Sequence, residues 1–212
     1  GAGHIDPNRA ANPGLVFDSG FVDWAGFLCG ASIGPAFCAE NGIPVLEASD
    51  LNTPSIAIGA LGGSRTVTRT VTNVSNRNAT YSLAASGLEG IDVSFSPASL
   101  TVRRGQTRSF SVTFTRKTAA LDAYAGGYVT LSTGASSSGH RDRNREPRTV
   151  RMPVVIKPVA LAAPAEVTGS YRVTFGYSGA FSATPRGLVG AGVAAGQVAT
   201  DGVATAASRA AC

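Results

Sequence analysis

The chain has 212 residues, a length that holds one large domain or two modest ones. Hydrophobic residues make up 43% of it, enough for a buried core, yet no apolar run approaches the roughly 20 residues of a membrane-spanning helix. Charged residues make up only 15%. Gly, Ala, Ser, Thr and Val dominate, which favours β structure joined by many turns. The excess of Arg over Lys, 16 against 2, indicates a GC-rich genome, and we expect a bacterial source.

The net charge of +5 is unevenly distributed along the chain. Residues 1–50 carry −5, residues 51–157 carry +9, and residues 158–212 carry +1. Such asymmetry indicates separate units. Nucleic-acid binding is one interpretation of the basic part, and a basic sandwich packed on an acidic neighbour is the other. The aromatic residues there lie at strand-like spacings, which favours core positions over base stacking, so no nucleic-acid partner is expected.

The first fifty residues predict two short helices. Asp6 is a plausible N-cap with Pro7 at the first helical position, and Asn12-Pro13-Gly14 ends this helix. The run LVFD that follows is extended.

The second predicted helix covers residues 18–30, with Asp18 or Ser19 as the N-cap and Gly30 as the stop. Its apolar residues recur at helical spacing: Phe21, Trp24, Ala25 and Leu28. Two short helices in succession cannot bury their apolar faces on each other alone, so they require a larger body.

Three cysteines are present, and two of them flank what is expected to be a short Gly- and Pro-containing loop, CGASIGPAFC. A Cys29–Cys38 disulfide would close a small ring, worth on the order of 2–3 kcal/mol, and would indicate an oxidising compartment. The alternative is two free thiols. Neither histidine lies near the pair and no second cysteine pair exists, so a zinc site is not expected. Cys212 is the last residue.

From Leu51 onward the pattern changes to β-rich runs, each bounded by Gly, Pro, Asn or Ser. Seven or eight such runs between residues 51 and 157 predict an antiparallel β-sandwich. The longest interruption, GASSSGHRDRNREP, predicts a solvated hairpin loop, with a regulatory or ligand-binding loop as the alternative. Residues 158–164 resemble a linker. The remainder, to residue 212, predicts a partial β-rich extension whose end is poorly ordered.

The segments GAGHIDPNRAANPGLVFD, FLCG, DLNTPSIAI and TVTRTVTNV, in this order, resemble the C-terminal part of subtilisin-like serine proteases. The similar subgroup carries a fibronectin type III-like domain after its catalytic domain. The resemblance covers residues 1–157. It implies that residues 1–50 end the α/β peptidase domain as a helical remnant and linker, with Gly1, Gly3 and Ala10 just past the helix that carries the catalytic Ser. It also implies a fibronectin type III-like sandwich over residues 51–157. Residues 165–192 are similar to an extra β region in some bacterial members.

No catalytic residue is expected in this chain, because the Asp, His and Gly-Thr-Ser-Met-Ala motifs of the family belong upstream of Gly1. A triad needs a base oriented by a carboxylate, and the only histidines are His4 and His140. The resemblance makes His4, beside Asp6, structural support, while His140 lies in the Arg-rich loop. No cofactor or metal motif occurs, since the Gly-rich run GLVGAGVAAG lacks the context of a dinucleotide site.

Two sequons are present, at Asn73-Val74-Ser75 and Asn78-Ala79-Thr80. In a bacterial product they are expected to be strand and turn residues only.

Two functions remain. The first is an accessory part of a secreted subtilisin-like serine endopeptidase, a hydrolase whose peptide bond cleavage belongs to the parent catalytic domain. The partners are then that domain and the parent's protein or peptide substrates, and the chain alone is inactive. The alternative is a stand-alone extracellular β-sandwich module that binds anionic polymers or a cell surface through its arginines.

Overall fold

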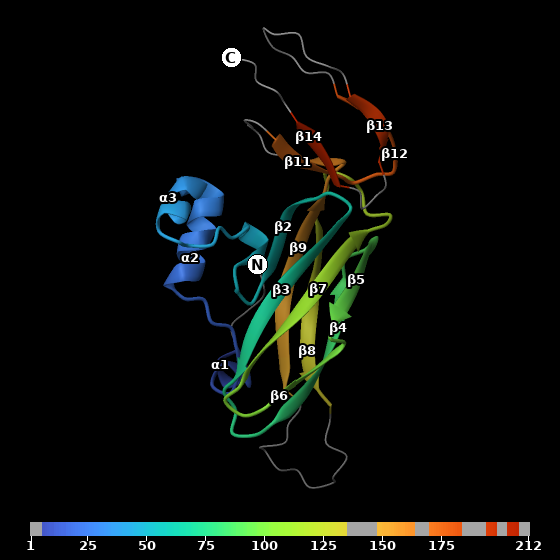
Figure 1. The fold of residues 1–212 in the computed structure, drawn as a ribbon. Coiled ribbons are helices and arrows are strands. Elements are labelled where there is room, and N and C mark those ends of the chain that lie inside the picture. The colour runs from blue at the N-terminus through green and yellow to red at the C-terminus, as the bar shows by residue number, and fades with distance from the viewer. Residues whose placement is uncertain (1–5, 135–147, 164–169, 184–193, 199–202, 208–212) are drawn as a thin grey trace.

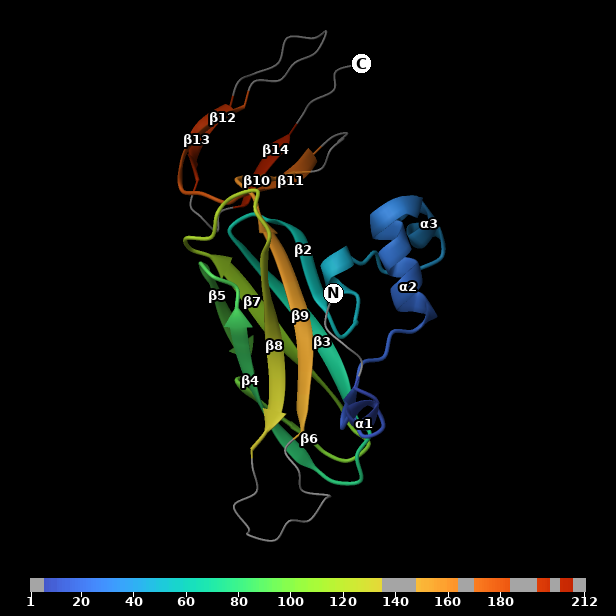
Figure 2. The same cartoon turned by 180° about the vertical axis from the view of Figure 1, so that it is seen from behind.

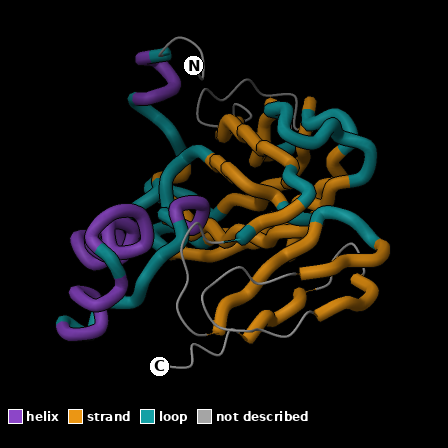
Figure 3. The backbone as a smooth tube through the Cα atoms, turned by 90° about the horizontal axis from the view of Figure 1, so that it is seen from above, coloured by secondary structure: helices purple, strands orange, loops and turns teal. Residues whose placement is uncertain are grey.

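The computed structural model describes residues 6–134, 148–163, 170–183, 194–198 and 203–207. Two β-sheets pack face to face, and a short helical segment lies to one side of them (Figure 1, Figure 2). A view from above shows these helices outside the two layers of strands (Figure 3). The prediction of a mainly β sandwich is confirmed.

One sheet has four antiparallel strands in the order β1–β3–β7–β5. Their bounds are β1 Leu15–Val16, β3 Ser64–Asn73, β5 Ile91–Ser96 and β7 Thr107–Arg116. Strands β3 and β7 pair from Ser64↔Thr115 to Thr72↔Thr107. Because β1 pairs with the end of β3, the N-terminal segment is hydrogen-bonded into this sheet.

The second sheet has five strands in the order β2–β9–β8–β4–β6. Their bounds are β2 Ile56–Leu61, β4 Ala79–Gly87, β6 Ser99–Val102, β8 Ala125–Thr133 and β9 Thr149–Pro158. The sequence predicted an antiparallel sandwich, and one pair departs from it, because β2 runs parallel to β9. Parallel neighbours need a long crossover, and the intervening strands of both sheets provide it.

The core lies between the sheets and follows from strict alternation along the strands. In β7, Phe110, Val112 and Phe114 are at most 1% exposed, while the residues between them face outward. Buried side chains from both sheets complete one continuous cluster.

The outer face of β3 and β7 carries hydroxyls instead of charges. Five Ser or Thr residues of β3 lie directly opposite five of β7 in register, and each opposed pair is hydrogen-bonded: Ser64–Thr115, Thr66–Thr113, Thr68–Ser111, Thr70–Ser109 and Thr72–Thr107. Cross-strand pairs of this kind contribute roughly 0.2–1 kcal/mol each.

The helical segment begins with α1 Pro7–Ala10, where Pro7 takes the first position as predicted. It continues with α2 Phe21–Leu28, a π-helical turn Cys29–Ile33, α3 Pro35–Glu40 and a 3₁₀ turn Ala48–Asp50. The predicted N-cap of α2 is wrong, because Gly20 takes that position and its N–H donates to Asp23 Oδ2 at 2.8 Å. The predicted stop at Gly30 is also wrong, because the helix passes directly into the π-helical turn.

Beyond β9 the chain forms two smaller sheets. Strands β10 Leu161–Ala162, β11 Ser170–Phe175 and β14 Val203–Ala207 form one, and β12 Gly179–Ala183 with β13 Ala194–Val198 form the other. Strands β13 and β14 therefore form in the last part of the chain, where the sequence is rich in small residues and its β pattern is weak. Part of the predicted linker is itself strand β10.

Candidate functional site

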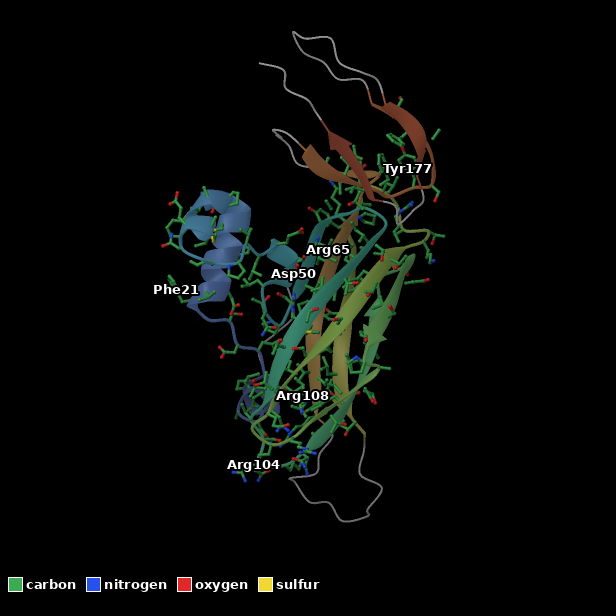
Figure 4. The ribbon with its side chains drawn as sticks, viewed as in Figure 1. Phe21, Asp50, Arg65, Arg104, Arg108 and Tyr177 are labelled. Carbon is green, nitrogen blue, oxygen red and sulfur yellow. A yellow bond between two sulfur atoms is a disulfide. The ribbon has the colours of Figure 1, made fainter. Side chains whose placement is uncertain are left out.

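Seven large apolar side chains of the helical segment are exposed. We call this set the helical apolar surface, and its members are Phe21, Val22, Trp24, Leu28, Ile33, Phe37 and Val45. Phe21 is 82% exposed and every other member is at least 42% exposed. Figure 4 shows Phe21 on the side of α2 that faces away from the sandwich. So many large apolar side chains exposed on one short segment are typical of an interaction surface.

Helix α2 exposes its large residues because it buries its small ones. Of the four residues of the predicted apolar face, only Ala25 is buried. The adjacent Gly26 lies against the carbonyl oxygen of Pro44, where a Cβ would be only 2.3 Å from that oxygen. Leu46 N–H donates to Gly26 O at 3.0 Å. The chain segment after α3 therefore covers the small-residue side of α2, and the large side chains are left outside.

The predicted cysteine pair lies inside this segment. The structure joins Cys29 and Cys38 in a disulfide with Cα atoms 6.1 Å apart. Cys29 is 2% exposed and Cys38 is fully buried. The intervening residues, expected to be a short loop, are helical in the π-helical turn and the start of α3. The disulfide thus links the start of the π-helical turn, directly after α2, to α3.

A buried arginine holds the linker after these helices against the sandwich. Arg69 occupies an inward-facing position of β3 and is 1% exposed. Its guanidinium donates to four backbone carbonyls, those of Ser49, Thr53, Ser55 and Thr68, at 2.8–3.0 Å. Burial lowers its pKa to about 10, and the charge of Asp50 opposes that shift. Because buried charges need such satisfaction, the arginine fixes residues 49–55 in one conformation.

Asn52 adds a second connection between the same parts. Its Nδ2 donates to Asp18 O at 2.8 Å and Thr70 O at 2.9 Å, and its Oδ1 accepts from Thr70 N–H at 2.8 Å. Ser19 Oγ donates to Asn52 O at 2.7 Å. Asp18 and Ser19, expected to cap α2, therefore tie the chain before α2 to β3.

We call Arg69 and Asn52, with the hydrogen bonds just described, the clamp. An ion-pair group lies beside it. Arg65 on β3 pairs with Glu47 and, at 3.1 Å, with Asp50 (Figure 4). These contacts join the acidic N-terminal part to the basic sandwich with the sign that the charge distribution predicts. Partly exposed pairs of this kind contribute roughly 0–1 kcal/mol, so the hydrogen bonds of the buried Arg69 side chain, together with those of Asn52, are the stronger connection.

The structure does not test the other residues considered from the sequence. His4, His140 and Cys212 lie outside the described residues. The part of the chain that the structure describes contains no histidine, and within it no group of three or more His, Cys, Asp or Glu could hold a metal ion. No helix of the described part is long and apolar enough to cross a membrane.

A shallow hollow lies at the end of the sandwich formed by the β4–β5 turn and the loop before β8. Small residues line most of it, and its ionisable side chains are those of Glu89 and Tyr124. These two groups do not make a nucleophile and its general base. The helical apolar surface is thus the strongest candidate for a functional site.

Comparison with known proteins identifies the family. The fibronectin type-III domain family matches residues 50–156, which include both sheets of the sandwich apart from β1. The chain belongs to the fibronectin type-III domain family.

This fibronectin type-III chain is also homologous to plant subtilisin-like proteases. It is 40% identical to subtilisin-like protease SBT2.6 of Arabidopsis thaliana over 66% of this chain and 18% of that protein. It is 38% identical to SBT2.5 over 73% and 18%, and 36% identical to SBT5.3 over 74% and 20%. The resemblance to subtilisin-like proteases predicted from the sequence is confirmed. These relatives are plant proteins, so the expected bacterial source has no support.

The matched region of this chain therefore spans about a fifth of the length of these curated relatives. Among solved structures, the Salmonella enterica SafA pilin with the SafB chaperone aligns over 73% of this chain and 80% of that chain, with 13% identity and a TM-score of 0.41. That likeness is too slight to carry an argument.

Proposed function

We propose that this chain is a non-catalytic accessory part of a secreted subtilisin-like serine endopeptidase. In this proposal residues 1–50 complete the rear of the peptidase domain, residues 51–157 form the attached sandwich, and residues 158–212 form a β-rich extension. The observation that carries the proposal is the helical apolar surface, which is exposed in a chain that is homologous to large proteases.

The partner that fits this surface is the peptidase domain of the same protease. About four fifths of the length of each relative lies outside the matched region. In this proposal that part supplies a large, covalently linked peptidase domain. Full burial of a side chain such as Phe21 contributes about 1.5–3 kcal/mol. Several such side chains exceed what the Arg65 ion pairs contribute, so apolar burial would drive the docking.

The clamp around Arg69 would make this docking rigid. Residues 49–55 are held against β3 by the hydrogen bonds of the buried Arg69 side chain, so a peptidase domain bound to α2 would be held in a fixed orientation to the sandwich. The sandwich would then stabilise and position that domain without touching the bond that is cut. A disulfide persists in oxidising compartments, and the Cys29–Cys38 bridge supports a secreted location.

A chimera tests this proposal. This chain would replace the matching region of Arabidopsis thaliana SBT2.6, and the secreted yield and peptidase activity would be measured. Replacing Phe21 and Leu28 by Ser should reduce both at least several-fold. Tyr124→Ser is the matched control, since Tyr124 is 73% exposed and lines the hollow between the β4–β5 turn and the loop before β8. Equal activity of the double variant and the control would contradict the proposal.

The chain without a peptidase domain should hydrolyse no peptide. The measurement is turnover of a chromogenic peptide with and without a serine-protease reagent. Turnover that the reagent abolishes would show a nucleophile within this chain and overturn the proposed division of roles.

A second candidate function is binding of an anionic polymer, and one observation favours it. The turns that precede β4 and β7 are adjacent, since Gly105 N–H donates to Asn73 O at 2.9 Å, and four arginines lie on or beside them. Within the described residues, these arginines form no ion pair with an acidic side chain: Arg77, Arg103, Arg104 and Arg108. Retention on heparin at physiological salt that is lost steeply with added salt is the expected result for this function.

A further inference from the structure

The two sequons of the chain differ sharply in the environment of their asparagines. Asn73 is the last residue of β3 and is fully buried. Its Nδ2 donates to the carbonyls of Arg77 and Val102, both at 2.9 Å. Its Oδ1 accepts from Ser75 N–H at 2.9 Å and Ser75 Oγ at 2.6 Å. Every polar group of this side chain is engaged, so a sugar on Nδ2 is incompatible with the folded sandwich.

Asn78 lies five residues later and is exposed, in the turn before β4. Its Oδ1 accepts from Arg104 N–H at 3.0 Å. That bond fixes the carboxamide on the surface, while Nδ2 has no hydrogen bond to another described residue. The third sequon residue, Thr80, is also exposed, and its hydroxyl lies 2.9 Å from that of Thr101.

We propose that Asn78 carries an N-linked glycan and that Asn73 does not. The inference rests on the secreted location proposed above and on a eukaryotic pathway, which the plant relatives support. The donor class is a polyisoprenyl diphosphate oligosaccharide. A bond forms between Asn78 Nδ2 and C1 of the first sugar, the C1–O bond to the diphosphate breaks, the polyisoprenyl diphosphate leaves, and the amide proton passes to a base of the transferase.

The position of this glycan is compatible with the proposed docking. Asn78 is hydrogen-bonded to Arg104, and Figure 4 shows Arg104 at the end of the sandwich away from Phe21. A bulky, solubilising group there would leave the helical apolar surface free. It would cover part of the arginine-rich end of the sandwich, between Arg77 and Arg104.

The test is site-resolved glycan occupancy. The full chain would be expressed in plant cells behind a cleavable secretion signal and recovered from both medium and microsomes. Peptide N-glycosidase treatment in ¹⁸O-water then marks each formerly glycosylated asparagine by mass spectrometry. We expect Asn78 to be marked in most molecules and Asn73 in none. Thr80→Ala should abolish the label, Thr80→Ser should retain it, and Ser75→Ala should leave it unchanged.

A bare Asn78 in folded chain, or a glycan on Asn73, would overturn the inference. The SBT2.6 chimera separates this failure from failure of the proposed function. An active chimera with an unmodified Asn78 would contradict only the glycan proposal. An inactive chimera whose Asn78 is glycosylated would contradict only the proposed accessory role.

Discussion

The sandwich buries its large apolar side chains, whereas the helical segment exposes many of its own. In the sandwich, Phe110 and Phe114 are at most 1% exposed, since two sheet faces close over them. In the helical segment, Phe21 is 82% exposed and Trp24 is 46% exposed, since the backbone of the following residues packs on the glycine side of α2. The sandwich therefore buries its large core side chains between its own sheets, whereas the helical segment leaves large apolar side chains exposed.

The largest expected effect comes from the same substitution made in each region. Phe110→Ala should lower the free energy of unfolding of the isolated chain by about 3–5 kcal/mol. Phe21→Ala should change it by less than about 0.5 kcal/mol, because an exposed ring loses little burial. Urea unfolding followed by circular dichroism measures both. A loss of more than about 2 kcal/mol for Phe21→Ala would mean that the helical apolar surface is already buried.

The clamp between the two regions gives the next effect. Arg69→Met should destabilise the chain by about 3 kcal/mol, because a hydrogen bond to a charged group contributes about 1.5–3 kcal/mol and the buried carbonyl bond to Ser49 is lost, while the three part-buried carbonyls can be hydrated instead. Arg104→Met is the matched control, since Arg104 is exposed and its loss should cost under about 0.5 kcal/mol. Equal unfolding midpoints for the two variants in urea would show that the clamp contributes nothing.

The disulfide should affect the helical segment alone. Cys29→Ser with Cys38→Ser should destabilise this segment by about 2–3 kcal/mol and leave the sandwich unchanged. Hydrogen exchange followed by mass spectrometry separates the regions. We expect residues 21–40 to lose protection from exchange and residues 107–116 to keep it. In the native, non-reduced chain, reaction of both thiols with a thiol reagent would show that the bridge is absent.

The smallest effect concerns a phenol inside the sandwich. Tyr81 is fully buried, and among the described residues its hydroxyl has no hydrogen-bond partner. Burial raises its pKa, and the charges of Arg148 and Arg77 oppose the shift. Its contribution to stability is therefore complete below the ordinary tyrosine pKa of about 10 and is lost as the pH rises through the higher pKa of the folded state.

Tyr81→Phe removes this titration. At pH 7 the free energy of unfolding should change by less than about 1 kcal/mol, because no hydrogen bond is lost. Above pH 10 the wild-type chain should lose stability faster than the variant. Parallel pH dependences of the two unfolding midpoints would contradict the raised pKa.

The sandwich could be predicted from the sequence because alternation fixes both strand and face. The run TVTRTVTNV shows its pattern directly, with Val67 and Val71 inward and Thr68 and Thr70 outward. The same pattern places Arg69 inward, and this was the available signal for the clamp. Its partners could not be predicted, because they are backbone carbonyls of residues 49–55, which alternation does not locate.

The helical segment was harder to predict because its packing depends on backbone contacts. Spacing placed Phe21, Trp24 and Leu28 on one face of α2 and predicted that this face needs a larger body to cover it, but it did not show which side of α2 the chain itself covers. The glycines at 26 and 30, which allow the backbone near Pro44 and Leu46 to approach, decide which side is covered. Gly30, which the sequence predicted to be a helix stop, instead allows the backbone of Leu46 to pack closely against it.

The most direct test of docking is the exposure of the helical apolar surface with and without a peptidase domain. Hydroxyl-radical footprinting would compare the isolated chain with the SBT2.6 chimera, reading side-chain oxidation at Phe21 and Trp24 and, as the reference, at Tyr124. We predict that oxidation of Phe21 and Trp24 falls at least several-fold in the chimera while Tyr124 is unchanged. Equal oxidation of Phe21 and Trp24 in an active chimera would contradict the docking of this surface on the peptidase domain.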